Sequence, residues 1–214
     1  PAQPPGRRVL IVDKPERTQT QLVIGRLGTH LRDRVFRPLF VANAAFGGMF
    51  TARLVRAVRT ERGYSYTAQS RLGADEATEA WSMYAHPSSS DVAACAALEI
   101  ELFEKLVEDG LTKAELALAK GYLTKSHAFD LDTPQKRLEP RLEAELHGLP
   151  RSFWAEWVAR VRAVTLDDAN RAIRARLGPD DLSIVALATA AEVRDGLRGL
   201  PNVARLDVVP WGRV

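Results

Sequence analysis

The chain has 214 residues, enough for one large domain or two small ones with a substantial hydrophobic core. Its 30 basic and 27 acidic residues leave a net charge of +3, and it has no lysine- or arginine-rich block, so we expect no nucleic-acid partner. No run approaches the roughly 20 apolar residues of a membrane span, so none is expected. The single Cys95 excludes an internal disulfide and leaves the compartment open.

The first eight residues, PAQPPGRR, differ in composition from the rest of the chain. Prolines at this density disfavour a helix and are typical of linkers between domains. We therefore predict a linker over residues 1–8 and a single domain over residues 9–214. The same feature suggests a piece of a longer or processed protein.

In chain order, strand patterns occur near both ends and helical patterns fill the middle. Apolar or alternating runs predict strands at 9–12, 19–28, 64–71, 78–85, 182–187 and 206–209. Apolar residues at three- or four-residue steps predict helices at 32–46, 50–62, 89–110, 112–116, 123–129, 134–146, 152–164 and 165–178. This order favours an α+β fold, a mainly antiparallel sheet with a helical layer packed on one face.

Several helix ends carry recognisable capping signals. Thr112 and Glu115 form a predicted capping box, flanked by Leu111 and Leu116 as a hydrophobic staple. Residues 89–90 are a serine pair that can cap the long helix following them. Gly63 is expected to end the helix that begins near Phe50, in which Phe50 is placed on the apolar side.

Residues 46–66, FGGMFTARLVRAVRTERGYSY, carry the clearest functional pattern. The helix places an arginine at every third position, including Arg59, and the strand after Gly63 places Tyr64 and Tyr66 on one face. The guanidinium of Arg59 and the phenol of Tyr66 would then approach from the two sides of one turn. Both groups donate hydrogen bonds that suit a polarised carbonyl. From the residues alone, a solvated arginine face and ordinary strand aromatics remain open alternatives.

Motifs for other catalytic chemistry are missing from the sequence. The four histidines are His30, His86, His127 and His147. None has a second histidine three or four residues away, and neither H-E-x-x-H nor H-x-x-E-H occurs, so we expect no zinc site within this chain. The sequence also has no G-x-S-x-G elbow and no phosphate-binding glycine loop.

The pattern F-G-G-M-F-T-A-R-L, followed by V-R-T-E-R-G-Y-S-Y, resembles the second domain of pitrilysin/insulinase-type zinc peptidases. This superfamily also contains the mitochondrial processing peptidases and two-subunit bacterial enzymes. V-L-I-V-D-K-P and T-Q-T-Q-L-V-I-G resemble the opening strands of that domain. H-G-L-P, V-T-L-D-D-A-N and L-G-P-D, at 147–150, 164–170 and 177–180, resemble its closing helices.

The resemblance implies that this chain is the substrate-positioning, chamber-closing half of a zinc metalloendopeptidase. Arg59 and Tyr66 match the family's arginine and tyrosine and would hold the peptide near the scissile carbonyl. Zinc and the general base would come from a metal-bearing domain or partner subunit, and this chain would hold no cofactor and would not be active alone. The alternative is a non-catalytic structural or assembly subunit of the same superfamily.

Overall fold

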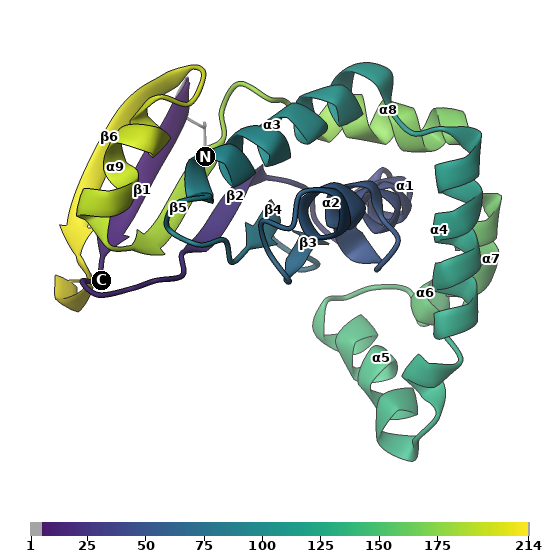
Figure 1. Ribbon diagram of the computed structural model, residues 1–214. Helices are drawn as coiled ribbons and strands as arrows, with labels where there is room; N and C mark the ends of the chain where they lie inside the picture. Colours follow the sequence, from purple (N-terminus) through teal and green to yellow (C-terminus); the bar gives the residue numbers. More distant parts are fainter. Residues whose placement is uncertain (1–5, 214) are drawn as a thin grey trace.

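The computed structural model describes residues 6–213 and is centred on a six-stranded sheet (Figure 1). The order is β3-β4-β2-β5-β1-β6. β2 is antiparallel to β4 and β5, β3 is antiparallel to β4, and β1 is parallel to β5 and β6. The strands are β1 (Arg7–Asp13), β2 (Gln21–Leu27), β3 (Ala68–Leu72), β4 (Ala80–Ala85), β5 (Ser183–Ala188) and β6 (Val203–Pro210). The predicted α+β class with a mainly antiparallel sheet is confirmed.

The helices lie largely between β4 and β5 in the sequence. They are α1 (Phe36–Asn43), α2 (Arg53–Val55), α3 (Val92–Asp109), α4 (Lys113–Ser126), α5 (Pro134–Leu146), α6 (Ser152–Ala155), α7 (Trp157–Ala163), α8 (Leu166–Arg176) and α9 (Ala190–Arg198). π-helical turns η1 (Ala44–Gly48) and η2 (Arg56–Glu61) extend α1 and α2, and short 3₁₀ turns are η3 (Phe129–Leu131) and η4 (Trp211–Arg213). The sequence patterns did not predict α9.

β1 begins at Arg7, two residues before the predicted start of the domain. Residues 1–5 of the predicted linker lie outside the described residues. Both the linker and the single-domain division therefore stay predictions.

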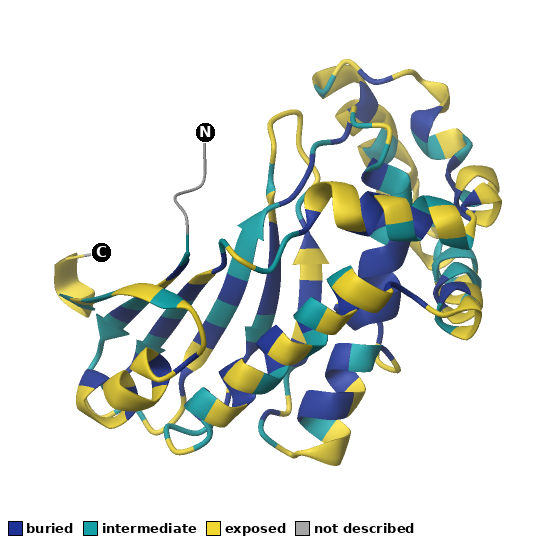
Figure 2. Cartoon of the chain, turned by 90° about the horizontal axis from the view of Figure 1, so that it is seen from above, coloured by how far each residue is buried: buried dark blue, intermediate teal, exposed yellow. Residues whose placement is uncertain are grey.

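One face of the sheet forms the core and the other is largely open. Along β1, Val9 and Ile11 are buried while Leu10 and Val12 are only partly covered, as expected from the two-residue period of a strand. Figures 1 and 2 show α3 and α9 lying over one face of the sheet with exposed residues on their outer surfaces. In the core, the rings of Trp81 and Phe103 stack at 4.5 Å and join β4 to α3.

Two of the three predicted capping signals are confirmed, whereas the separate helices predicted at 112–116 and 123–129 are wrong, because the single helix α4 spans Lys113–Ser126. Thr112 accepts from the Glu115 N–H and the Glu115 side chain accepts in return, completing the capping box at α4. Gly63 has a φ of +67°, the left-handed conformation that suits a glycine after a helix. The predicted serine cap of α3 is wrong, because its N-cap residue is Asp91 and makes no side-chain capping bond.

The predicted strand at 64–71 starts too early. β3 begins at Ala68, and Tyr64 packs against the core while the Tyr66 side chain is exposed, so the two tyrosines do not share a strand face. The cause is local. Ser65 Oγ donates to the Thr67 carbonyl (2.6 Å) and accepts from the His86 N–H (2.8 Å), and these bonds form a turn instead of a strand ladder.

Taken as one helix, residues 36–61 are long and apolar enough to cross a membrane by length and composition alone. Within the domain, 67% of the most apolar window of this helix is buried. The core helix of a folded domain is buried to this extent, and it can have the same length and apolar composition as a membrane-spanning helix.

Candidate functional site

A helix and a tight turn bring Arg59 and Tyr66 together. The Arg62 N–H donates to the Ala57 carbonyl (3.1 Å), which closes the wide turn η2. After Gly63 the chain reverses, and the Tyr64 N–H donates to the Val58 carbonyl (3.0 Å). This backbone closure carries Tyr66 back over the helical residue Arg59.

The Arg59 guanidinium lies between two aromatic rings. Its Cζ is 3.9 Å from the ring centroid of Tyr66 and 4.7 Å from that of Phe50. Such cation–π contacts orient a guanidinium through its flat faces and leave its N–H edges free. Within residues 6–213, the Arg59 guanidinium makes these two ring contacts and no hydrogen bond or ion pair. The guanidinium is therefore held in place while its donors remain available.

Phe50 is 69% exposed, which corrects its expected position on the apolar side of the helix. The Met49–Ala52 turn separates Phe50 from the buried face that begins with Leu54 and Val55. The prediction treated the chain from Phe50 onward as one regular helix. The packing of Phe50 on Arg59 therefore could not be predicted. The signal available in the sequence is the glycine pair at 47–48, which interrupts the helix.

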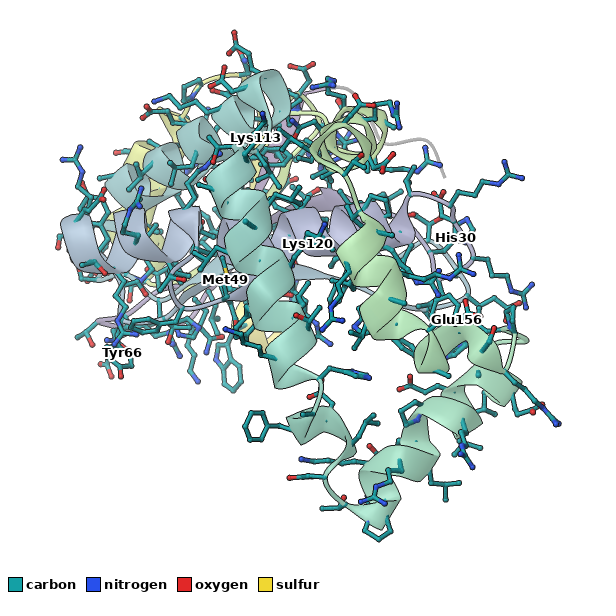
Figure 3. All side chains as sticks on the ribbon, turned by 90° about the vertical axis from the view of Figure 1, so that its right-hand side faces the viewer. His30, Met49, Tyr66, Lys113, Lys120 and Glu156 are labelled. Atoms are coloured by element: carbon teal, nitrogen blue, oxygen red, sulfur yellow. The ribbon has the colours of Figure 1, made fainter. Side chains whose placement is uncertain are left out.

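A hollow of about 310 Å³ adjoins this stacked group. Its wall includes the backbone of Gly47 and Gly48 and the side chains of Arg59, Tyr66 and Tyr122. Figure 3 shows Tyr66 at one margin of the domain, with α4 between it and His30. Tyr66 is 79% exposed and Tyr122 is 46% exposed, so aromatic surface from two distant chain segments faces solvent at this hollow.

A buried asparagine positions the glycine pair against the sheet. Asn43 Oδ1 accepts hydrogen bonds from Ser70 Oγ (2.7 Å) and Trp81 Nε1 (2.8 Å), and its Nδ2 donates to the Ser70 carbonyl (3.3 Å). These bonds join the end of α1 to β3 and β4. Asn43 is thus a positioning residue behind the hollow, and no motif in the sequence identified it.

Gly47 permits the close approach of this turn to β3. A Cβ at residue 47 would lie 2.6 Å from Ser70 Oγ and 2.7 Å from the Ser70 backbone nitrogen. Gly47→Ala should therefore lower the free energy of unfolding by about 1–3 kcal/mol, because the strand backbone must move. Urea denaturation measures this change. Gly121→Ala is the matched control, since nothing lies within 4 Å of the added Cβ and a helical alanine stabilises. Equal stability of the two variants would contradict the packing argument.

The other arginines of the helix have different roles. Arg53 binds Glu115 through two hydrogen bonds of 2.9 Å and donates to the Gly110 carbonyl (3.0 Å). Burial alone would raise the pKa of the Glu115 carboxyl, but the bonds from Arg53 and Thr112 outweigh burial and hold the pKa below its ordinary value. Arg53 is therefore structural, and the interpretation of the arginines as one solvated face holds for Arg56, which pairs with Glu61 at the surface.

The described histidines do not approach one another as metal ligands. His127 lies 3.8 Å from Asp130 and His147 lies 3.5 Å from Asp75, in two different regions. Within residues 6–213, no group of three histidine, cysteine, aspartate or glutamate side chains has the arrangement needed to hold a metal ion. Cys95 is buried in the core, and burial, followed by the charges of Glu99 and Asp91, raises the pKa of its thiol.

Comparisons with known proteins identify the family. Residues 1–123 match the family described as the peptidase M16 inactive domain. An uncharacterized zinc protease of Mycobacterium bovis is 29% identical over 137 residues, covering 64% of this chain and 31% of the relative. A non-peptidase homolog of Helicobacter pylori is 25% identical over 142 residues, covering 66% of this chain and 33% of the relative. The matched regions thus span about a third of the length of these relatives.

The fold is shared with solved structures of the same kind. The crystal structure of a peptidase M16 inactive domain from Pseudomonas fluorescens superposes with a TM-score of 0.79 at 23% identity, covering 88% of this chain and 45% of that chain. The family match covers more than half of the sequence and confirms the resemblance found in the motifs. This chain belongs to the peptidase M16 family, as one of its inactive domains.

Proposed function

We propose that this domain positions peptide substrates for a metal-bearing peptidase domain that closes against it. The observation that carries the proposal is the Arg59 guanidinium, stacked between Phe50 and Tyr66 with its N–H edges free beside an open hollow. A peptide backbone offers carbonyl acceptors at regular intervals, and a fixed guanidinium can bind them without reorganising.

Each residue of the proposed site has a distinct part. Arg59 donates to a peptide carbonyl and fixes the register of the substrate. The Tyr66 phenol donates to the carbonyl under attack and favours the charge that develops on its oxygen. Phe50 and the ring of Tyr66 keep the guanidinium plane oriented, so the donors need not be ordered when the substrate arrives.

The family match implies zinc, and the described residues do not fit it. Because residues 6–213 provide no ligand set, zinc belongs in the proposal only as a component of another domain or subunit. Zinc there would supply Lewis-acid activation of the reaction. Arg59 and Tyr66 would bind and orient the peptide across the interface.

A second candidate function is a non-catalytic structural or assembly subunit. It is supported by the relative from Helicobacter pylori, which is named a non-peptidase homolog. A purely structural subunit does not need an arginine with free donors between two exposed rings. The site geometry therefore favours substrate positioning over this alternative.

Hydrolysis by the assembled protein tests the proposal. Arg59→Ala and Tyr66→Phe should each lower kcat/KM for a peptide substrate about 10²-fold, since each loses one donor at the reacting group. Zinc content and the urea unfolding midpoint of the Tyr66→Phe protein should stay unchanged. Arg56→Ala is the matched control, because Arg56 lies on the same helix and is exposed.

The outcome separates the two candidate functions. Loss of activity in the two site variants with a normal Arg56→Ala control supports substrate positioning. Wild-type kcat/KM in both Arg59→Ala and Tyr66→Phe would contradict substrate positioning by these two residues. Absence of any zinc-dependent hydrolysis in the complete wild-type protein would favour the structural subunit.

A further inference from the structure

A polar tract runs along the open face of β3 and β4, next to the hollow at Arg59. The alternation of β3 turns Gln69 and Arg71 to the exposed face while Ala68, Ser70 and Leu72 are buried. Gln69 lies opposite Tyr84, and Arg71 lies opposite Ser82. Directly opposite residues of an antiparallel pair share one face, so these four side chains form one set, named here the β3–β4 tract. Gln69 and Arg71 are exposed, Tyr84 is partly exposed, and Ser82 is buried between them.

Two hollows border this tract. The first, which contains Arg59 and Tyr66, includes Gln69 in its wall. A second hollow of about 360 Å³ is lined by Arg71, Ser82 and Tyr84. The two hollows share no lining residue, but Gln69 of the first and Tyr84 of the second are cross-strand neighbours, so the two walls adjoin at this pair. Gln69 and Arg71 are about 7 Å apart along the strand, roughly the rise of two residues of an extended peptide.

A glycine borders the tract on β2, and Arg71 is the one charged side chain among the four residues of the tract. Gly25 on β2 lies opposite Ser82, and a Cβ there would meet the Trp81 carbonyl oxygen at 2.7 Å. The Arg71 side chain is exposed, and its guanidinium makes no hydrogen bond or ion pair with the described residues 6–213. Asp75 and Glu79 lie farther along the hollow, in and beside the turn that joins the two strands.

We propose that the β3–β4 tract binds a second stretch of the peptide, an extended polar segment with one acidic side chain facing Arg71. This proposal rests on the proposed function, since the same peptide would occupy the hollow at Arg59. The Gln69 amide and the Tyr84 phenol supply donors to its backbone between the two arginines. Asp75 and Glu79 would repel a second acidic residue near the turn, so one acidic position is expected rather than an acidic run.

Peptide binding to the complete protein tests this proposal. The metal is removed by a chelator so that the peptide is not hydrolysed during the measurement. The probes are fluorescein-labelled peptides of about twelve residues, long enough to cover both hollows. They are built from alanine, serine and glycine, with a single glutamate, glutamine or lysine moved one position at a time. Fluorescence anisotropy reports the affinity. We expect one glutamate position to bind about tenfold more tightly than glutamine at the same position.

Arg71→Glu should reverse this preference, so that the lysine peptide binds more tightly than the glutamate peptide at that position. Arg194→Glu makes the same change of charge on α9, at the far end of the sheet (Figure 1), and should leave the preference unaltered. If the preference for glutamate over lysine is the same in Arg71→Glu and Arg194→Glu, or is absent in wild type, the proposal that the β3–β4 tract binds the peptide is wrong. Arg59→Ala should weaken all peptides equally, and no effect of Arg59→Ala would instead contradict the proposed function.

Discussion

Replacing Glu99 with glutamine should stabilise the domain at neutral and alkaline pH. Glu99 lies on the inner face of α3, is 0% exposed, and neither carboxyl oxygen has a hydrogen-bond partner among the described residues. Burial raises the pKa of its carboxyl from 4.5 to about 8. The folded protein therefore keeps Glu99 protonated over a range in which the unfolded chain releases the proton.

The sign of the pH dependence follows from this raised pKa. The contribution of Glu99 to stability is fully present below pH 4.5 and is lost progressively as the pH rises through about 8. The variant lacks this titration. Its free energy of unfolding should exceed that of wild type by about 3–5 kcal/mol at pH 8 and by little at pH 4.

Urea denaturation at a series of pH values measures the difference between Glu99→Gln and wild type. The control is Glu101→Gln on the same helix, because Glu101 is exposed and paired with Lys105. Its difference from wild type should show no rise of this size between pH 4 and pH 8. Parallel pH profiles for wild type and Glu99→Gln would mean that Glu99 is not a buried, proton-binding group.

Replacing Arg7 with methionine should destabilise the domain strongly. The Arg7 side chain is 1% exposed and lies where four chain segments meet. Its guanidinium donates to the carbonyls of Pro179 (3.2 Å) and Pro201 (3.0 Å) and pairs with Glu104 on α3. Methionine keeps much of the apolar stem but leaves these carbonyls without their donor. We expect a loss of about 3 kcal/mol in the free energy of unfolding.

The neighbouring Arg8 gives the matched control for Arg7. Arg8 is exposed on the same strand, so Arg8→Met should change the free energy of unfolding by no more than about 0.5 kcal/mol. Urea denaturation at one pH compares the two variants. A similar small effect of both substitutions would show that the buried guanidinium does not join the strands in the way its contacts suggest.

The fold was predictable wherever local chemistry decides the outcome. The capping box at Thr112 and the turn at Gly63 depend on residues close in sequence, and both are present in the structure. The contact between Arg59 and Tyr66 was expected on the same grounds, since one short turn joins them. Their role at a substrate stays a prediction.

Contacts between segments that are far apart in the sequence could not be predicted from local sequence patterns. Arg7 lies in a segment read as linker, and its partners are 97 to 194 residues away. Asn43 is bonded to residues of two strands that follow it by 27 and 38 positions. A polar residue in an apolar helix has the same local signature whether it faces water or a buried partner, so only the packed structure distinguishes the two cases.

The two π-helical turns, η1 ending in Gly47-Gly48 and η2 preceding Gly63, change how side-chain directions must be counted along the sequence. A π turn contains about one residue more than an α turn, so side chains after it point in directions that an ideal helical wheel misassigns. Arg59 lies inside η2, and its direction toward Tyr66 therefore depends on that extra residue. A relative that lacked one residue here would form an ordinary α turn and point the aligned arginine elsewhere. A relative can therefore have an arginine and a tyrosine aligned with Arg59 and Tyr66 and still lack the stacked pair that these residues form in this domain.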